Sequence, residues 1–209
     1  KPMLEAAIAM KAARGMEVEP EAAPQPTSLL TLTHGTVTAV EPVAAGERVC
    51  VDLAGLLLEG EGMLVGSTAS PMMLVHGETV PSAFVPVRPF RVNAGAVHHY
   101  VMLAEGHTCY LSELSPGDEV VVVGEDGRTR AVVVGRTKIE RRPMLKIRYT
   151  DGKGQEGHAM LQNAETVRAV GPDGGAISVT ELRTGQEILL WSGEKGRHLG
   201  RPVVSEVKE

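Results

Sequence analysis

A histidine and a carboxylate lie two positions apart in the segment LVHGET, where His76 precedes Glu78. On a β-strand, side chains two residues apart point to the same face, so both groups can reach one site. Such a pair can ligate a metal ion, or it can act as a base and the group that orients that base. The alternative is a histidine and a glutamate on a solvated sheet face, and the motif alone leaves both interpretations open.

The segment RPFRVNAGAVHHY gathers four further candidates in a stretch that is otherwise small and apolar: Arg88, Arg91, Asn93 and His98. The last three share a face of a strand only if Gly95 does not shift the register, and glycine often marks such a bulge. His98 and His99 must point in opposite directions on a strand. We therefore expect His98 to be the site residue and His99 to face away. The alternative is one exposed and one buried, hydrogen-bonded histidine without a chemical role.

Two polar segments later in the chain are candidates for substrate binding. The segment LQNAETVR supplies Gln162, Asn163 and Glu165, which either line a polar pocket or cap a short helix. The segment GRTRAVVVGRTKIERRP carries a local excess of cationic residues in an acidic chain: Arg128, Arg130, Arg136, Lys138, Arg141 and Arg142. Guanidinium groups bind phosphate and carboxylate bidentately, so this segment can attract an anionic substrate, although a charge run is more often a solvated face.

The elements that must hold these residues are predominantly β-strands. From residue 28 onward, short β-branched runs alternate with glycine-rich turns, and the sequence EDGR between two such runs predicts a hairpin. Residues 2–15 have helical spacing, and residues 17–27 are typical of a proline-rich linker. We therefore expect a helix and a linker in 1–27, followed by a mainly β catalytic domain in 28–209.

A weak internal repeat supports barrel-like modules built from hairpins. ELSPGDEVVVV at 113–123 matches ELRTGQEILLW at 181–191, and EPVAAGERVCV at 41–51 is a looser copy. Each copy is followed by a glycine turn and another strand-like run, so the domain is expected to contain two or three barrel-like repeats. Turn-then-strand units also look alike in any β-barrel, and the sequence leaves that explanation open.

Composition and charge argue against several classes of protein. The chain of 209 residues has a formal net charge of -5, a sequence pI near 5.8 and 3% aromatic residues, which disfavours a nucleic-acid binder. No apolar run approaches the ~18 residues of a membrane span. Cys50 and Cys109 lack CxxC spacing, so neither a thiolate zinc site nor a disulfide framework is indicated, and the cytoplasm is the expected compartment.

Several co-linear segments resemble the archaeal-type (type II) 3-dehydroquinate synthases: RVCVD, GEGMLVGS, LVHGE, RPFRVNAGAVHHY, YLSELSPGDEVVVV, GRTKIERRP, LQNAET, SVTEL and GRHLG. The resemblance runs from about Glu41 to the C-terminus. Members of this family are longer and carry an α/β portion before this region. The resemblance therefore implies that the expected helix at 2–15 is left over from an upstream α/β portion.

The resemblance also implies an enzyme that closes a ring on an aminated seven-carbon keto acid. Type II 3-dehydroquinate synthases deaminate such a substrate oxidatively with NAD and cyclise it. The related 3-amino-4-hydroxybenzoate synthases use manganese, take a phosphorylated substrate and retain the nitrogen.

Departures from the family pattern bear on the choice between these two types. This chain has DLAGLL and STASPMMLVH where the family commonly has DTCS and an SSG or SRG followed by LF. These departures adjoin His76 and Glu78, and the cationic segment suits a phosphate. We therefore expect the aminohydroxybenzoate type, with 3-dehydroquinate synthesis as the alternative.

On this interpretation a divalent metal, expected to be Mn²⁺, polarises the substrate carbonyl, and a histidine removes the adjacent proton for an intramolecular aldol closure. The expected catalytic residues are His76, His98 and Glu78. The expected metal ligands are His76, Glu78 and Glu165. The expected substrate-binding residues are Arg88, Arg91, Asn93, Arg141, Arg142, Gln162 and Asn163.

The expected partner is a small-molecule substrate, with no nucleic acid and no membrane, and NAD is needed only for dehydroquinate synthesis. The sequence leaves open whether the protein forms a homo-oligomer. A non-catalytic β-barrel binding module is the alternative to an enzyme.

Overall fold

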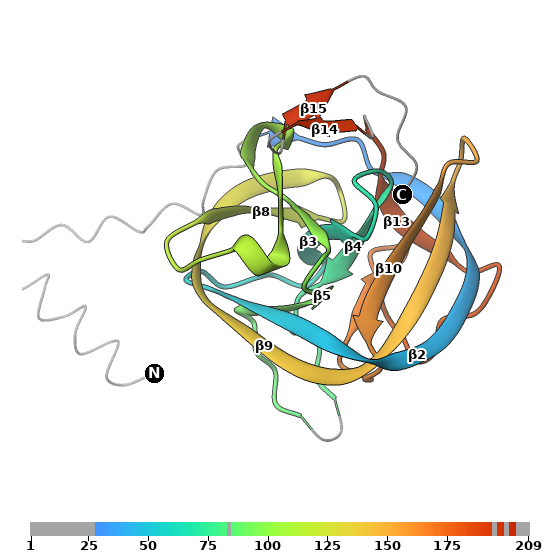
Figure 1. Cartoon of the computed structure of the whole chain (residues 1–209), viewed down its shortest axis with the longest axis horizontal. Coiled ribbons are helices and arrows are strands. Elements are labelled where there is room, and N and C mark those ends of the chain that lie inside the picture. The colour runs from blue at the N-terminus through green and yellow to red at the C-terminus, as the bar shows by residue number, and fades with distance from the viewer. Residues whose placement is uncertain (1–27, 83–84, 194–195, 199–200, 204–209) are drawn as a thin grey trace, which may run out of the picture.

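The computed structural model describes residues 28–82, 85–193, 196–198 and 201–203, so the expected helix at 2–15 and the linker lie outside the described residues. The regular elements of the described chain are almost all antiparallel strands (Figure 1). Its helices are two short 3-10 turns, η1 (Ala104–Gly106) and η2 (Leu111–Glu113), and no helix of this part is long and apolar enough to cross a membrane. The prediction of a mainly β fold is confirmed, whereas the domain boundary at residue 27 stays a prediction.

The strands, in chain order, are β1 (Ser28–Leu29), β2 (Thr33–Leu53), β3 (Glu61–Gly66), β4 (Met72–His76), β5 (Arg91–Ala96), β6 (Tyr100–Met102), β7 (Thr108–Tyr110), β8 (Glu119–Gly124), β9 (Arg128–Asp151), β10 (Glu156–Gln162), β11 (Arg168–Val170), β12 (Ala176–Ser178), β13 (Glu187–Trp191), β14 (Gly196–His198) and β15 (Arg201–Val203). β14 and β15 pair only with each other, and the other strands form one sheet.

Six strands of the large sheet close into a ring. Their order is β4, β13, β2, β9, β8 and β3, and β3 pairs back onto β4. Closure leaves these six strands without a free hydrogen-bonding edge over their paired lengths. The ring is not a regular barrel, because two of its strands are far longer than the others.

The two long strands, β2 and β9, form a twisted ribbon that runs along the lower side of the molecule (Figure 1). Buried and exposed residues alternate at both ends of β9, in 128–134 and 144–151, whereas 135–143 contains no buried residue. Each end of the ribbon therefore contributes an apolar face to the core. The segment between the two ends has both faces partly solvated. Register shifts at Thr38, between Val43 and Gly46 and after Asp52 add to its bending.

The interior of the ring is filled by β-branched and other aliphatic side chains, with one tyrosine. Val37, Val51, Val122, Ile147 and Tyr149 are each completely buried in the main cluster. Successive strands contribute them with period two, which is why the apolar runs of the sequence alternate with half-exposed residues. A smaller cluster packs on the other face of β3, β4 and β13 and includes Leu64, Met72 and Leu74.

The turn signals of the sequence are borne out locally. EDGR forms the hairpin between β8 and β9, where Gly127 has a φ of +81° that a side chain would disfavour. The first two copies of the repeat each fold as a glycine turn followed by a strand, β8 in one and β13 in the other. The looser copy at 41–51 lies within the continuous β2, so the number of barrel-like repeats stays a prediction.

Candidate functional site

A β-bulge in β5 separates the polar residues of RPFRVNAGAVHHY into two groups. Val49 of β2 pairs with Gly95, and the next residue, Cys50, pairs with Asn93, so Ala94 is an extra residue in the strand. Gly95 has a φ of +96°, and a Cβ there would lie 2.5 Å from Cε1 of His99. The register therefore does shift at the glycine, which leaves Arg91 and Asn93 on one side of the bulge and the two histidines on the other.

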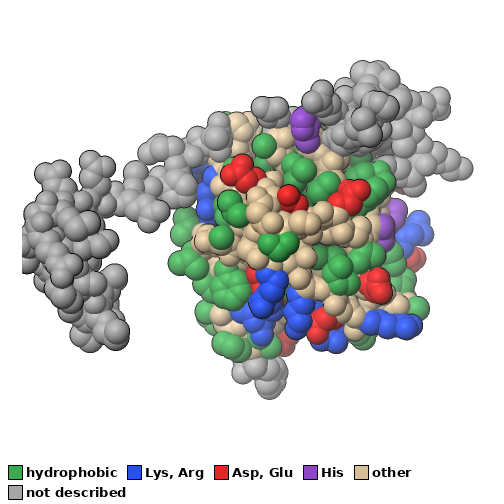
Figure 2. Space-filling model, turned by 60° about the vertical axis from the view of Figure 1, so that its left-hand side comes forward, with side chains coloured by type: hydrophobic (Ala, Val, Ile, Leu, Met, Phe, Trp, Pro, Cys, Tyr) green, Lys and Arg blue, Asp and Glu red, His purple; other side chains and the backbone are tan. Residues whose placement is uncertain are grey.

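Most of the predicted substrate-binding arginines belong to a network of ion pairs. We define the arginine cluster as Arg48, Asp52, Glu78, Arg88, Arg91, Arg136, Lys138, Glu140 and Arg142. Figure 2 shows Lys and Arg side chains gathered at the lower part of the face it presents, with Asp and Glu side chains among them. Because each cation of the cluster already has a carboxylate partner, the cluster as arranged stabilises the ribbon crossing and β5.

Asp52 is the centre of the buried half of the arginine cluster. Its carboxylate accepts hydrogen bonds from Arg91 Nε at 2.6 Å and Nη2 at 2.9 Å, and from Arg136 Nε at 2.9 Å. Burial alone would raise the pKa of Asp52, but hydrogen bonds from the two guanidinium groups outweigh it and lower that pKa. The same hydrogen bonds raise the pKa of Arg91. Asp52 is thus held ionised between two guanidinium groups, and the three groups together keep one positive charge.

The other predicted substrate-binding residues surround this cluster without forming one site. Asn93 is buried and donates to Gln162 Oε1 at 3.0 Å, while its own side-chain oxygen has no partner among the described residues. Asn163 and Glu165 are exposed on a turn, and no helix follows them for a side chain to cap. Arg141 is exposed and has no ion pair in the described part of the chain. Their roles in binding stay predictions.

His76 is held by backbone groups on both sides of its ring. It lies at the end of β4, with 1% of its surface exposed. Its Nδ1 lies 2.6 Å from the carbonyl oxygen of Gly77, and its Nε2 accepts from the amide of Gly60 at 3.0 Å. Burial lowers the pKa of His76, so the neutral imidazole with a proton on Nδ1 satisfies both contacts. Glu78 instead accepts from Arg88 at 2.9 Å, so the two side chains have separate partners.

The predicted metal ligands do not fit a metal site in this structure. His76 has no ring nitrogen left to coordinate an ion, and the Glu78 carboxylate is neutralised by Arg88. Among the described residues, no three histidine, cysteine, aspartate or glutamate side chains are grouped so that they could hold a metal ion.

His98 and His99 have different surroundings, as predicted, but they lie in the turn after β5 and not on a strand, so strand alternation is not the cause. His99 is completely buried; its Nδ1 lies 3.0 Å from the carbonyl oxygen of Ala94, and its Nε2 accepts from the amide of Met160 at 2.8 Å. Burial lowers the pKa of His99 to about 3, so the ring stays neutral and acts as a structural bridge between β5 and β10. His98 is exposed, and its Nε2 lies 3.0 Å from the Ser67 hydroxyl.

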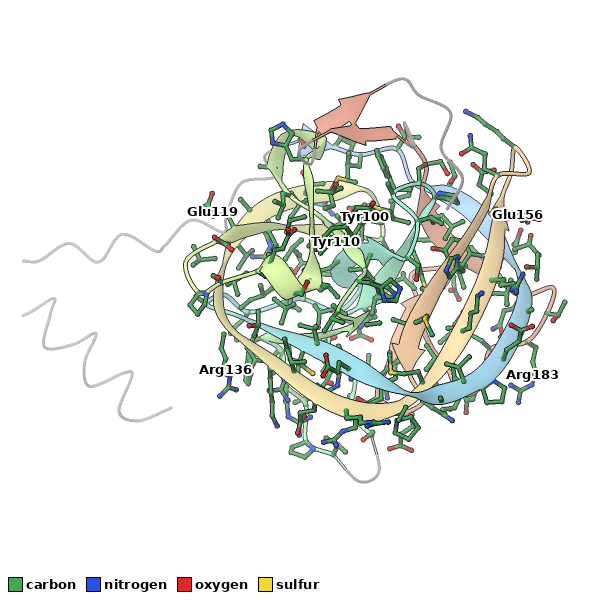
Figure 3. All side chains as sticks on the ribbon, in the orientation of Figure 1. Tyr100, Tyr110, Glu119, Arg136, Glu156 and Arg183 are labelled. Carbon is green, nitrogen blue, oxygen red and sulfur yellow. The ribbon has the colours of Figure 1, made fainter. Side chains whose placement is uncertain are left out.

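A pocket of about 450 Å³ lies beside this Ser67–His98 pair. We call it the β10 pocket, and it is lined by Thr38, Ala39, Glu41, Thr68, Lys146, Arg148, Tyr149, Glu156, Gly157 and His158. The amide of Ser67 donates to the carbonyl of His158 at 2.9 Å, which ties the loop carrying the Ser67–His98 pair to β10. Glu156 of the pocket and Arg136 of the arginine cluster lie on opposite sides of the molecule (Figure 3).

Three strands place the ionisable side chains of the β10 pocket on one face. Arg148 of β9 lies directly opposite Ala39 of β2 and His158 of β10, and Lys146 lies opposite Glu41. Residues two apart on each strand share this face, whereas Ile147 and Tyr149 point into the core. Burial first, and then the charges of Lys146, His98 and Arg148, lower the pKa of His158, so its ring is neutral at pH 7.

The sequence analysis missed Lys146, Glu156 and His158. The signal was present, because LKIRYTDGKGQEGHAM has two strand-like runs around a glycine-rich turn, which is typical of a hairpin. Pairing the two runs across that turn would have placed Arg148 opposite His158.

The comparisons with known proteins place this chain in a family. Residues 34–209 match the family described as "3-dehydroquinate synthase II C-terminal domain". The chain therefore belongs to the type II 3-dehydroquinate synthase family, and the resemblance drawn from its sequence is confirmed.

Three relatives illustrate how similar this chain is to curated proteins. The chain is 51% identical over 174 residues to a "3-dehydroquinate synthase" of Methanoregula boonei, covering 83% of this chain and 53% of that protein. It is 52% identical over 183 residues to a "3-dehydroquinate synthase homolog" of Persephonella marina, covering 88% and 55%. It is 49% identical over 176 residues to a "3-dehydroquinate synthase" of Methanopyrus kandleri, covering 83% and 44%. The chain thus spans about half the length of the curated relatives it matches, and no solved structure matches it.

Proposed function

We propose that this chain is part of a carbocycle-forming synthase that acts on an aminated seven-carbon keto acid. The observation that carries the proposal is its identity of about half to several proteins named 3-dehydroquinate synthase. The β10 pocket supports it, because a cavity with cationic, acidic and imidazole groups suits a small polar substrate better than a partner protein.

The names of these relatives favour 3-dehydroquinate as the product. NAD is then the proposed oxidant in the deamination. 3-Amino-4-hydroxybenzoate, which the sequence analysis places first, is the second candidate. The segment after Asp52 favours this second product, because Leu53, Ala54 and Gly55 replace the polar residues common in the family. This segment lies directly beside the arginine cluster.

The described residues lack two features that are typical of sites for these cofactors. The only helices there are the 3-10 turns η1 and η2, and neither follows a strand in the glycine-rich arrangement that holds a dinucleotide pyrophosphate. The expected ligands of Mn²⁺ likewise do not form a site. The use of NAD or manganese is therefore a proposal about the whole protein.

Two described imidazoles beside the β10 pocket, His98 and His158, are candidates to move a proton. Burial lowers the pKa of His98, so it is a neutral base at pH 7, and the Ser67 hydroxyl fixes the orientation of its ring. We propose that His98 accepts the proton from the carbon next to the substrate carbonyl, which prepares that carbon for the aldol closure.

Product analysis tests the proposed function. The protein containing this chain is incubated with the free and the phosphorylated aminated seven-carbon keto acid, each with and without NAD and Mn²⁺. NADH formation with release of ammonia from the free substrate supports dehydroquinate synthesis. A nitrogen-retaining aromatic product that depends on Mn²⁺ supports the second candidate. Absence of any cyclised product would contradict both and favour a binding module.

A further inference from the structure

We propose that the β10 pocket binds the charged end of a zwitterionic amino acid, with Lys146 and Arg148 on its carboxylate and Glu156 on its ammonium group. This inference rests on the proposed function, because the substrate class named there carries both a carboxylate and an amino group. It adds the location at which this chain recognises those two groups.

The ionisable groups of the β10 pocket are available to a ligand. Lys146 and Glu156 have no ion pair or hydrogen bond among the described residues, and neither has the ring of His158. Arg148 has only a 3.6 Å contact with Glu41, and both side chains are about half exposed, so this contact is weak and readily replaced. In the arginine cluster, by contrast, Arg88, Arg91 and Arg136 each already have a carboxylate partner.

The cations and the carboxylate of the β10 pocket follow a fixed order across the sheet face that lines it. Lys146 and Arg148 are neighbours two residues apart on β9, so a carboxylate placed between them can accept from both. Glu156 lies on β10 two residues from His158, so the two side chains share a face. It pairs with Thr150, which is two residues from Arg148 on β9. A ligand with its carboxylate at the β9 cations therefore directs an adjacent ammonium group toward Glu156.

His158 lies directly opposite Arg148 and two residues from Glu156 on β10. A neutral imidazole there can accept a hydrogen bond from an ammonium group. Thr68 and the backbone of Gly157 close the edge of the pocket, with the Tyr149 ring directly beneath Gly157. A Cβ at Gly157 would lie 2.6 Å from that ring, so this position must stay small to keep the pocket wall in place.

Simple seven-carbon probes test the proposal without requiring turnover. The full chain, labelled with ¹⁵N, is titrated with 2-aminoheptanoate, heptanoate and heptylamine, and binding is followed through the amide signals of Thr68, Gly157 and His158. We expect 2-aminoheptanoate to bind about tenfold more tightly than either singly charged probe, because it engages both sets of charges. Equal affinity for the zwitterion and heptanoate would overturn the assignment of the ammonium group to Glu156.

Two variants identify the groups responsible. Lys146→Ala should weaken 2-aminoheptanoate and heptanoate by about tenfold, and Glu156→Gln should weaken 2-aminoheptanoate and heptylamine by a similar factor. Lys153→Ala removes an exposed lysine of the β9–β10 hairpin that does not line the pocket, and it should leave all three affinities unchanged. Unchanged 2-aminoheptanoate affinity in both Lys146→Ala and Glu156→Gln would overturn the site.

The same variants separate this proposal from the proposed function. Zwitterion binding at the β10 pocket by a protein that forms no cyclised product would support the pocket and contradict the ring-forming activity. Ring formation with an unchanged kcat/KM in Lys146→Ala and Glu156→Gln would support the activity and overturn the pocket as the substrate site.

Discussion

The buried histidine of the HH pair should make folding sensitive to acid in a way that one substitution removes. His99 has a pKa of about 3 in the folded chain and an ordinary value of 6.5. Because the folded pKa is depressed, the unfolded chain binds more protons between these values, and stability falls as pH falls below about 6.5. From pH 7 to pH 5, His99 alone should cost about 2 kcal/mol of the free energy of unfolding. The loss should approach about 5 kcal/mol below pH 3.

The test compares wild type with His99→Gln in urea unfolding at pH 7 and pH 5. Glutamine keeps a donor and an acceptor for the Ala94 carbonyl and the Met160 amide but does not titrate. The variant is expected to be less stable than wild type at pH 7. Its free energy of unfolding should then fall by about 2 kcal/mol less than that of wild type between pH 7 and pH 5. His34→Gln, which removes an exposed histidine of β2, is the matched control and should retain the wild-type loss.

A second measurement keeps this prediction testable if His99→Gln does not fold. In the wild-type chain, the ring resonances of His99 should show no titration between pH 7 and pH 5. Titration of that ring near pH 6.5, or equal stability losses in wild type and His99→Gln, would refute the assignment of acid sensitivity to this buried ring.

Further predictions concern single positions, each measured by urea unfolding. Gly95→Ala should destabilise by more than about 2 kcal/mol, because it combines a positive φ with a clash against the His99 ring. Gly106→Ala, with a φ of +72° and open space around it, should cost only about 1–2 kcal/mol, and equal costs would contradict the clash. Asp52→Asn should cost about 3–5 kcal/mol by leaving Arg91 buried without its anion. Asp126→Asn at an exposed pair should cost less than about 1 kcal/mol, and a similar loss in both would argue against a structural role for Asp52. Tyr149→Phe should cost about 1 kcal/mol, because the Pro71 carbonyl that accepts from the Tyr149 hydroxyl also accepts from the hydroxyl of Thr68. A loss above about 3 kcal/mol would show that this second bond does not compensate.

Local features of the fold were predictable because their causes are local. The EDGR hairpin depends on neighbouring residues, and so does the bulge at Gly95, whose glycine marks the shift in register. The ring closure was not predictable in this way, since β3 must meet both β4 and β8. A pattern along the chain contains no information on which distant strands pair.

The candidate site was less predictable for the same reason. His76 resembles a catalytic or metal-binding histidine until the Gly60 amide is found against its ring, and that amide comes from another turn. Arg136 reads as a free cation until Asp52 is placed beside it by the pairing of β2 with β9. Lone polar side chains suggest chemistry in a sequence, whereas the structure shows which of them already have partners.

The β2–β9 ribbon sets the order in which the chain can fold during synthesis. Gly35 pairs with Asp151 and Leu53 with Val134, so β2 leaves the ribosome long before its partner exists. Its unpaired edge stays open to incorrect pairing in that interval, and pairing across such separations is slow, on the order of milliseconds to seconds in small β domains. One end of the ribbon carries the Asp52 ion pairs and the other carries the β10 pocket. Both regions therefore become ordered only after β9 has been synthesised.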